Sequence, residues 1–276
     1  AKTVGKTLIL SPDQKPYIGT ADGLKNATAL GTASAPYDLS TKGGSVARST
    51  ANSYLISAPG HYRIPLVYGN AIKNNNENYV AYQFSGSAGY INVNGQQRVN
   101  ILPKFVDHDG KEINNPWIEK TNGKANNGIN GAQIVWSDEA NLVNLAPDPI
   151  YRDGSGNAFV KFEVTQANIK SGNAVIAVKK GNTIVWSWHL WFAPKNALDK
   201  IPVTNKQNKV YNFTNEALGW KPTKWTGTSY STPRTVKVKV EQTIANNGVK
   251  QTTVITITQN AGITERRGNT TLYQWG

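Results

Sequence analysis

The chain of 276 residues contains no cysteine and no methionine. Without cysteine it can form no disulfide framework, no thiol nucleophile and no cysteine-based zinc site, so burial of a core must stabilise it. The absence of methionine even at position 1 leads us to expect a processed or truncated product. No apolar run approaches the roughly 20 residues of a membrane-spanning helix, and no signal peptide is recognisable, so we expect no membrane span in this chain.

Acidic residues are also scarce, because 17 Asp and Glu stand against 30 Lys and Arg, which gives a formal net charge of +13. Such an excess indicates nucleic-acid binding only if the cations gather on one face beside a recognisable module. Here they are dispersed among Val, Thr and Asn, and the densest pairs are Lys179-Lys180 and Arg266-Arg267. We therefore expect no nucleic-acid partner and favour contact with acidic glycans or an anionic cell surface.

Almost every periodic segment alternates apolar and polar residues, which predicts strands, and no segment has a sustained helical period with caps. Hairpins are expected at Asn94-Gly95, at Lys180-Gly181-Asn182 and at Asn246-Asn247-Gly248, where turn residues separate two such segments. Further strands are expected at residues 7–10, 53–57, 62–68, 79–84, 133–136 and 158–164. This pattern predicts an all-β protein of tandem immunoglobulin-like β-sandwiches with antiparallel sheets.

Composition divides the chain into four expected parts. Residues 1–48 are expected to form an N-terminal strand and a linker, and residues 49–195 a β-sandwich domain. A composition shift near residues 194–205 marks the boundary to a second, smaller β-sandwich at 196–262, and residues 263–276 form a C-terminal tail.

The sequence contains no recognisable catalytic or metal-binding centre. The three histidines, His61, His108 and His189, lie far apart in unlike contexts, and no G-x-S-x-G nucleophile motif occurs. Carboxylates are few, and Asp138 and Glu139 are the nearest to an aromatic-rich strand, but nothing selects a pair for glycoside hydrolysis. We therefore expect no enzyme activity, no bound metal and no cofactor.

The stretch IVWSWHLWF, residues 184–192, is the most unusual in the chain. On a strand, Ile184, Trp186, Trp188 and Leu190 share one face, which we expect to be core, whereas Ser187, His189 and Trp191 share the other. The second face suits a partly covered sheet surface, an inter-domain contact or a ligand surface. The candidate ligand or interface residues of the whole chain are His189, Trp191, Trp220 and Trp225.

Several stretches together carry a family resemblance: STANSYLISAPGHYRIPLVYGNAI (49–72), GNAVIAVKKGNTIVWSWHLWF (172–192), YNFTNEALGW (211–220), RTVKVKVEQT (234–243), VITITQNAG (254–262) and GNTTLYQWG (268–276). They resemble Bacteroidetes surface proteins of the fimbrillin-like and pilus-associated kind, over most of residues 49–276. The stretches at 234–243 and 254–262 also resemble the closing strands of BACON-type modules. The sequence departs from the family pattern at Ser53, where a cysteine is expected, so no role of that cysteine carries over.

The resemblance implies a secreted or outer-membrane-anchored β-sandwich protein without a known catalytic centre. The leading hypothesis is a non-catalytic structural or adhesive protein of the cell surface, as a subunit of a pilus or related appendage. It would act outside the cell or on the outer-membrane surface, with other surface subunits, glycans or a host surface as partners. Residues 4–11 alternate as an ordinary first strand of the sandwich would, which is the favoured interpretation, and strand exchange with another subunit is the alternative. The competing function is a carbohydrate-binding module of a glycan-utilisation system.

Overall fold

The computed structural model describes residues 6–10, 20–82, 89–101, 105–226, 229–230, 232–242, 247–260, 262–263 and 267–272. The chain divides into two compact units. The larger unit comprises residues 19–221 and 272–276, and the smaller unit comprises residues 1–18 and 222–271. Strands dominate both units, so the predicted all-β class is confirmed.

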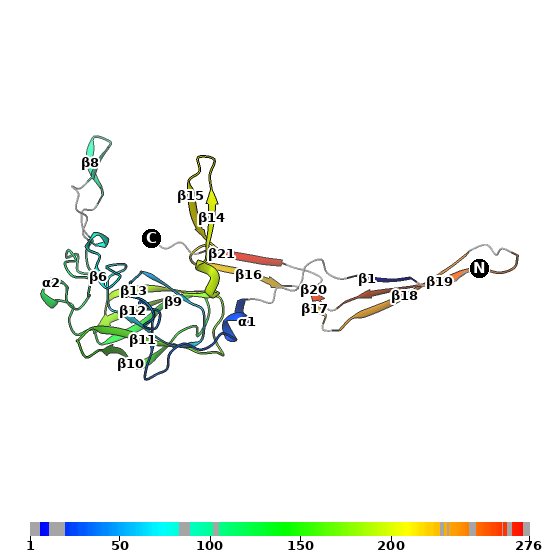
Figure 1. Cartoon of the computed structure of the whole chain (residues 1–276), viewed down its shortest axis with the longest axis horizontal. Helices are drawn as coiled ribbons and strands as arrows, with labels where there is room; N and C mark the ends of the chain where they lie inside the picture. The colour runs from blue at the N-terminus through cyan, green and yellow to red at the C-terminus, as the bar shows by residue number, and fades with distance from the viewer. Residues whose placement is uncertain are drawn as a thin grey trace. The chain divides into compact units, whose positions relative to one another are not determined.

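The larger unit contains two four-stranded sheets (Figure 1). The first has the order β10 (Asn144–Arg152), β11 (Ala158–Val164), β4 (Gly60–Pro65) and β2 (Tyr37–Asp38). The second has the order β3 (Ser53–Ile56), β13 (Thr183–Phe192), β12 (Gly172–Lys180) and β9 (Gly131–Ser137). One apolar core joins the two sheets, with inward side chains that include Tyr62, Ile64, Val160, Phe162, Ile176, Val178, Trp188 and Leu190.

Short elements complete the larger unit. Its helical segments are α1 (Thr20–Lys25), α2 (Thr121–Lys124), η1 (Tyr79–Ala81) and η2 (Lys195–Leu198). Its two-stranded pairs are β5 (Ile72–Lys73) with β6 (Asn76–Glu77), β7 (Gly89–Val93) with β8 (Gln96–Ile101), and β14 (Lys200–Thr204) with β15 (Val210–Thr214). Among the described residues, no helix is long and apolar enough to cross a membrane.

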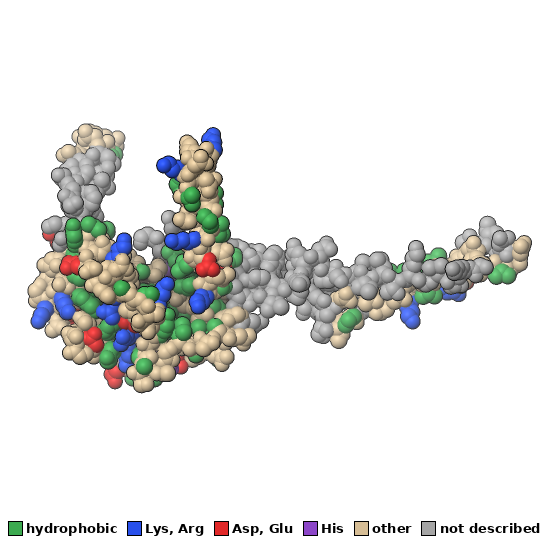
Figure 2. Space-filling view, in the orientation of Figure 1, with side chains coloured by type: hydrophobic (Ala, Val, Ile, Leu, Met, Phe, Trp, Pro, Cys, Tyr) green, Lys and Arg blue, Asp and Glu red, His purple; other side chains and the backbone are tan. Residues whose placement is uncertain are grey.

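The β14–β15 hairpin stands off the body of the larger unit, and all ten of its strand residues are exposed (Figures 1 and 2). Its register places Ile201 opposite Phe213 and Val203 opposite Tyr211, so these four side chains share one face. Figure 2 shows apolar side chains along this hairpin and lysines at its tip. The hairpin therefore exposes an apolar face that nothing in the described structure covers.

The smaller unit contains a three-stranded sheet with the order β1 (Lys6–Leu10), β19 (Thr252–Gln259) and β18 (Arg234–Glu241). The antiparallel β18–β19 pair confirms the hairpin predicted around Asn247-Gly248, and both turn residues have positive φ angles, 53° and 79°. The other pairs are β16 (Trp220–Thr226) with β21 (Arg267–Leu272), and β17 (Ser229–Tyr230) with β20 (Gly262–Ile263). Residues 220, 221 and 272 of the first pair belong to the larger unit.

The two other predicted hairpins are also confirmed. β7 and β8 turn at Asn94-Gly95, where both φ angles are positive, and β12 and β13 turn at Gly181. These turns were predictable because Asn and Gly adopt positive φ at low cost.

Several expectations differ from the structure. The sheets are not purely antiparallel, since β3 pairs in parallel with β13, β2 with β4, and β1 with β19. Residues 79–81 form a 3-10 turn instead of a strand, because Asn78 O and Tyr79 O accept bonds from N–H groups three residues ahead, and residues 83–84 lie outside the described set. Tandem immunoglobulin-like topology stays a prediction.

The expected linker within residues 1–48 is partly built into the larger unit. β2 adds to the first sheet, and the buried Asp38 carboxylate accepts hydrogen bonds from Arg48 and Arg63 at 3.2 and 3.3 Å. The larger unit extends to residue 221, beyond the expected boundary at 195/196, because Trp191 and Asn173 donate hydrogen bonds to the backbone carbonyls at 220 and 219. The expected tail begins within β20 and continues through β21.

Candidate functional site

The aromatic strand β13 is buried on both faces from Trp188 to Phe192. Trp188 and Leu190 point into the core, as predicted, and Trp186 packs against that core with its ring centroid 4.9 Å from that of Tyr68. The prediction for Ile184 was wrong, because its side chain is 39% exposed. A bulge opposite Val178 and Lys179 shifts the alternation there, so Val185 is buried in place of Ile184.

His189 lies on the outer face of the second sheet and is only 4% exposed. Its Nε2 lies 2.8 Å from the Asn173 Oδ1, and its Nδ1 lies 3.1 Å from the Ser53 Oγ. An amide oxygen can only accept, so Nε2 carries the proton and donates it, and in the neutral ring Nδ1 accepts from the Ser53 hydroxyl. Burial lowers the pKa of His189 to about 4, so the ring is neutral at pH 7.

Asn173, on β12, is completely buried and connects His189 to a carboxylate. Its Nδ2 donates to Asp138 Oδ2 and to the backbone carbonyl of Gly219, both at 3.2 Å. Its backbone N–H donates to Asp138 Oδ1 at 2.7 Å. The two acceptors around Nδ2 and the donor beside Oδ1 fix the orientation of the amide.

A cluster of four charged side chains continues this network: Asp138, Glu139, Lys170 and Lys221. Lys221 Nζ lies 2.5 Å from Glu139 Oε1 and 3.6 Å from Asp138 Oδ2, and Lys170 Nζ lies 2.7 Å from Glu139 Oε2. Burial acts to raise the pKa of Glu139, but the hydrogen bonds from the two lysines outweigh it and the pKa is lowered. Glu139 is therefore ionised at neutral pH.

Trp191 is 1% exposed and forms a small apolar cluster with Leu55, Ala193 and Ala197. Its indole Nε1 donates to the backbone carbonyl of Trp220 at 2.9 Å. The outer face of β13 is thus covered by the chain that follows it, and neither His189 nor Trp191 is open to solvent. An aromatic platform for a sugar would need these side chains to be exposed to solvent.

The structure brings three of the four predicted residues together: His189, Trp191 and Trp220. Trp220 is partly exposed at the start of β16, and Trp225 lies in the same strand, but its side chain is outside the described set. Sequence reasoning missed Ser53 and Asn173, which only the pairing of β3, β13 and β12 places beside His189. It also missed Lys221, which the return of the chain at 219–221 places beside Asp138 and Glu139. Asp138 and Glu139 were noted in the sequence as carboxylates near an aromatic strand, without a partner.

This arrangement is a buried chain of polar groups, Ser53–His189–Asn173–Asp138. Within the described residues, no group of three or more His, Asp or Glu side chains could hold a metal ion. The network connects four segments of the larger unit through hydrogen bonds, and its buried groups have partners, as buried polar groups require.

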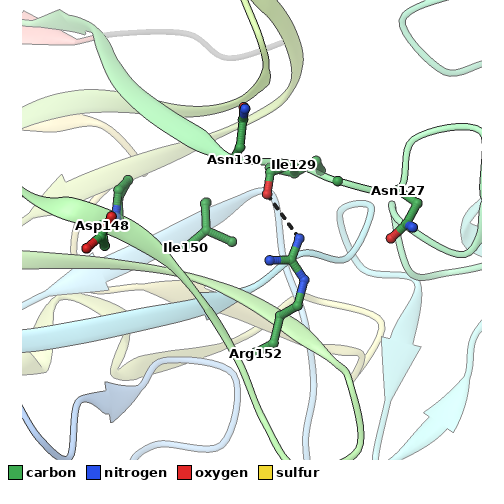
Figure 3. Close-up of a pocket in the computed structure, with 8 residues that line it drawn as sticks. Asn127, Ile129, Asn130, Asp148, Ile150 and Arg152 are labelled. Carbon is green, nitrogen blue, oxygen red and sulfur yellow. Dashed lines mark hydrogen bonds between the residues drawn. The ribbon is translucent and has the colours of Figure 1, made fainter.

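A separate groove of about 470 Å³ lies between the loop before β9 and strand β10 (Figure 3). Arg152 donates to the backbone carbonyl of Ile129 at 3.0 Å and to the Glu119 carboxylate at 2.6 Å. The polar side chains that line the groove are Asn127, Asn130, Asp148 and Arg152. A smaller hollow of about 260 Å³ shares Asn127 and adds Trp117 and Lys120.

The amides, the carboxylate and the neighbouring indole of these two hollows are groups that hydrogen-bond or stack on sugars. The sequence did not predict these hollows, because nothing in the local sequence places residues 127–130 beside β10 or beside Trp117.

Comparisons of the chain with family models, with curated proteins and with solved structures found no match.

Proposed function

We propose that this protein is a non-catalytic structural or adhesive component of the cell surface, a subunit of a pilus or related appendage. The observation that carries the proposal is the open apolar face of the β14–β15 hairpin. The motif resemblance to fimbrillin-like proteins supports the same role and an extracellular or outer-membrane location.

The exposed fractions of this face are large. Tyr211 and Phe213 are 53% and 58% exposed, and Ile201 and Val203 are both 47% exposed. A two-stranded hairpin alone is marginally stable in water, and contiguous exposed apolar side chains mark interaction surfaces. Covering this face with a partner would therefore stabilise both the hairpin and the complex.

The charge of the hairpin indicates the kind of partner. Residues 200–215 contain Lys200, Lys206 and Lys209 and no acidic residue. Two such hairpins packed face to face would bring their lysines together, which opposes self-pairing. The favoured partner is a different surface with an apolar centre and acidic rim, on another subunit.

We also propose that residues 4–11 could join subunits by strand exchange. Residues 6–10 form β1, at the edge of its sheet, in parallel register with residues 255–259. An edge strand is held by one neighbour only, so its exchange into another subunit would break one ladder of hydrogen bonds and form another.

Immunogold electron microscopy of cells that produce the protein tests the function directly. We expect label along surface appendages, and loss of that label in a Tyr211→Ser/Phe213→Ser double variant. The matched control is Asn212→Ser, on the opposite face of the same strand, which should keep the label. Label confined to the cell interior, or equal appendage labelling by the double variant, would contradict the proposal.

The groove of Figure 3 favours a second candidate function, carbohydrate binding. A glycan array with the parent chain and with Asn127→Ala and Asp148→Ala variants would test it. Binding that both variants weaken would support a glycan site at this groove, and a parent that binds no glycan would eliminate it. Trp191→Ala would be uninformative here, because Trp191 is buried and its loss would disturb folding.

A further inference from the structure

Two side-chain nitrogens of different chemistry meet at one carboxylate oxygen. Asp138 Oδ2 lies 3.2 Å from the amide Nδ2 of Asn173 and 3.6 Å from the ammonium Nζ of Lys221. The side chain of Asp138 is 4% exposed, that of Lys221 is 21% exposed, and Asn173 is completely buried. An amine and a carboxamide are therefore held against the same acid, largely shielded from water.

The carbonyl of Asn173 faces a donor. His189 Nε2–H donates to Asn173 Oδ1 at 2.8 Å, on the side of the amide opposite to Asp138. A hydrogen bond at this oxygen polarises the carbonyl and would stabilise the negative charge that develops there if a nucleophile added to the carbon. The orientation is fixed before any reaction, because every polar atom of the Asn173 amide has a partner.

We infer that Lys221 and Asn173 form an intramolecular isopeptide bond. Lys221 Nζ adds to Asn173 Cγ, the new C–N bond forms, the bond from Cγ to Nδ2 breaks, and one molecule of ammonia leaves. Nothing is oxidised or reduced, and no co-reactant is needed. The product is a secondary amide between β12 and the start of β16.

The acids of the cluster provide the proton transfers. Lys221 must lose a proton before its amine can attack, and Asp138 is placed to accept it. Asp138 also contacts the leaving nitrogen, so the same carboxyl group returns the proton as ammonia departs. Glu139, at 2.5 Å from Nζ, positions the lysine.

The positions of Lys221 and Asn173 indicate what the bond would do for the larger unit. Lys221 is the last residue before the chain leaves the larger unit, and Asn173 lies in a central strand of its second sheet. A covalent link would close the loop from 173 to 221, which reduces the freedom of the unfolded chain. Tension on the chain at residue 222 would then pass to β12 directly, without peeling away the segment that covers β13.

Mass spectrometry of the full chain, denatured after purification, tests the inference. We expect an intact mass lower than the sequence mass by one ammonia, and a tryptic product that joins residues 171–179 to residues 210–224. Trypsin leaves the Lys221–Pro222 bond uncut, so both partners lie in defined peptides. A parent chain with the full sequence mass and no joined peptide would overturn the inference.

Lys221→Arg is the matched variant, because it keeps the positive charge beside Glu139 but has no nucleophilic amine at neutral pH. We expect this variant to have its full sequence mass and no joined peptide. Cyclisation of Asn-Gly sequences also releases ammonia. The joined peptide, and not the mass deficit alone, therefore identifies the cross-link. An ammonia deficit that persists in Lys221→Arg, without a joined peptide in the parent, assigns the loss to those sequences and refutes the cross-link.

Discussion

The indole of Trp191 donates to the backbone carbonyl of Trp220 at 2.9 Å, across 29 positions of sequence. This bond and the apolar cluster around Trp191 hold the segment after β13 against the outer face of that strand. The two tryptophans thus have unlike roles, because Trp191 contributes a buried side chain and Trp220 contributes a main-chain acceptor.

Trp191→Ala should therefore lower the free energy of unfolding by about 3–5 kcal/mol, the usual cost of deleting a buried aromatic side chain. Urea denaturation followed by circular dichroism would measure it. Trp220→Leu is the control, since it keeps the carbonyl and should cost much less. Equal losses in the two variants would argue against this division of roles.

His189 should make stability depend on pH. Its pKa is about 4 in the folded protein and 6.5 in an unperturbed side chain. Between these values the unfolded chain binds one proton more than the folded chain, so the free energy of unfolding rises with pH. The stabilisation is complete above pH 6.5 and is lost as pH falls to about 4, by about 3 kcal/mol at most.

Urea denaturation at a series of pH values, with His189→Gln beside the parent, would test this linkage. The glutamine amide can still donate to Asn173 but does not titrate, so the slope between pH 6.5 and 4 should flatten in the variant. Identical slopes in both proteins would show that other groups carry the dependence.

Asp38 should be among the most sensitive charged positions. Its buried carboxylate accepts from both Arg48 and Arg63, and also from the Ser40 hydroxyl at 2.6 Å. Asp38→Asn would leave the two partly buried arginines without their counter-charge, at about 2–3 kcal/mol, below the cost of breaking a fully buried pair. Glu163→Gln, in an exposed pair with His61 at 3.8 Å, should cost less than about 1 kcal/mol. Thermal unfolding would measure both losses of stability. A lower midpoint for Glu163→Gln than for Asp38→Asn would contradict this expectation.

Gly60 and Gly44 form a matched pair of glycines with positive φ, 151° and 91°. A Cβ on Gly60 would lie 2.0 Å from the Leu30 carbonyl oxygen, whereas one on Gly44 would meet no atom within 4 Å. Gly44→Ala should cost about 1 kcal/mol through backbone strain alone. Gly60→Ala must also displace the backbone of Leu30, so its midpoint in urea should fall clearly further. Similar midpoints would contradict the close approach.

Local patterns predicted many of the strands and three of the hairpins of this protein. Alternation in the segments around Gly181 and Asn247-Gly248 predicted antiparallel pairs, and the structure has them, because a hairpin depends on a turn and on neighbours close in sequence. The same alternation predicted Trp188 and Leu190 as core. It failed at Ile184, because a bulge depends on the partner strand and leaves no mark in the strand itself.

The candidate site was predictable only in part. His189 and Trp191 stood out by residue type, but their partners come from strands and loops far away in sequence, and pairing between such segments is not encoded by any local period. The sequence by itself determined that the chain is β-structured and where three of its hairpins turn. Only the tertiary structure decided that Ser53 and Asn173 contact His189 and that Lys221 contacts Asp138. Parallel pairing of β3 with β13 and the return of residues 219–221 bring together groups that alternation alone leaves apart.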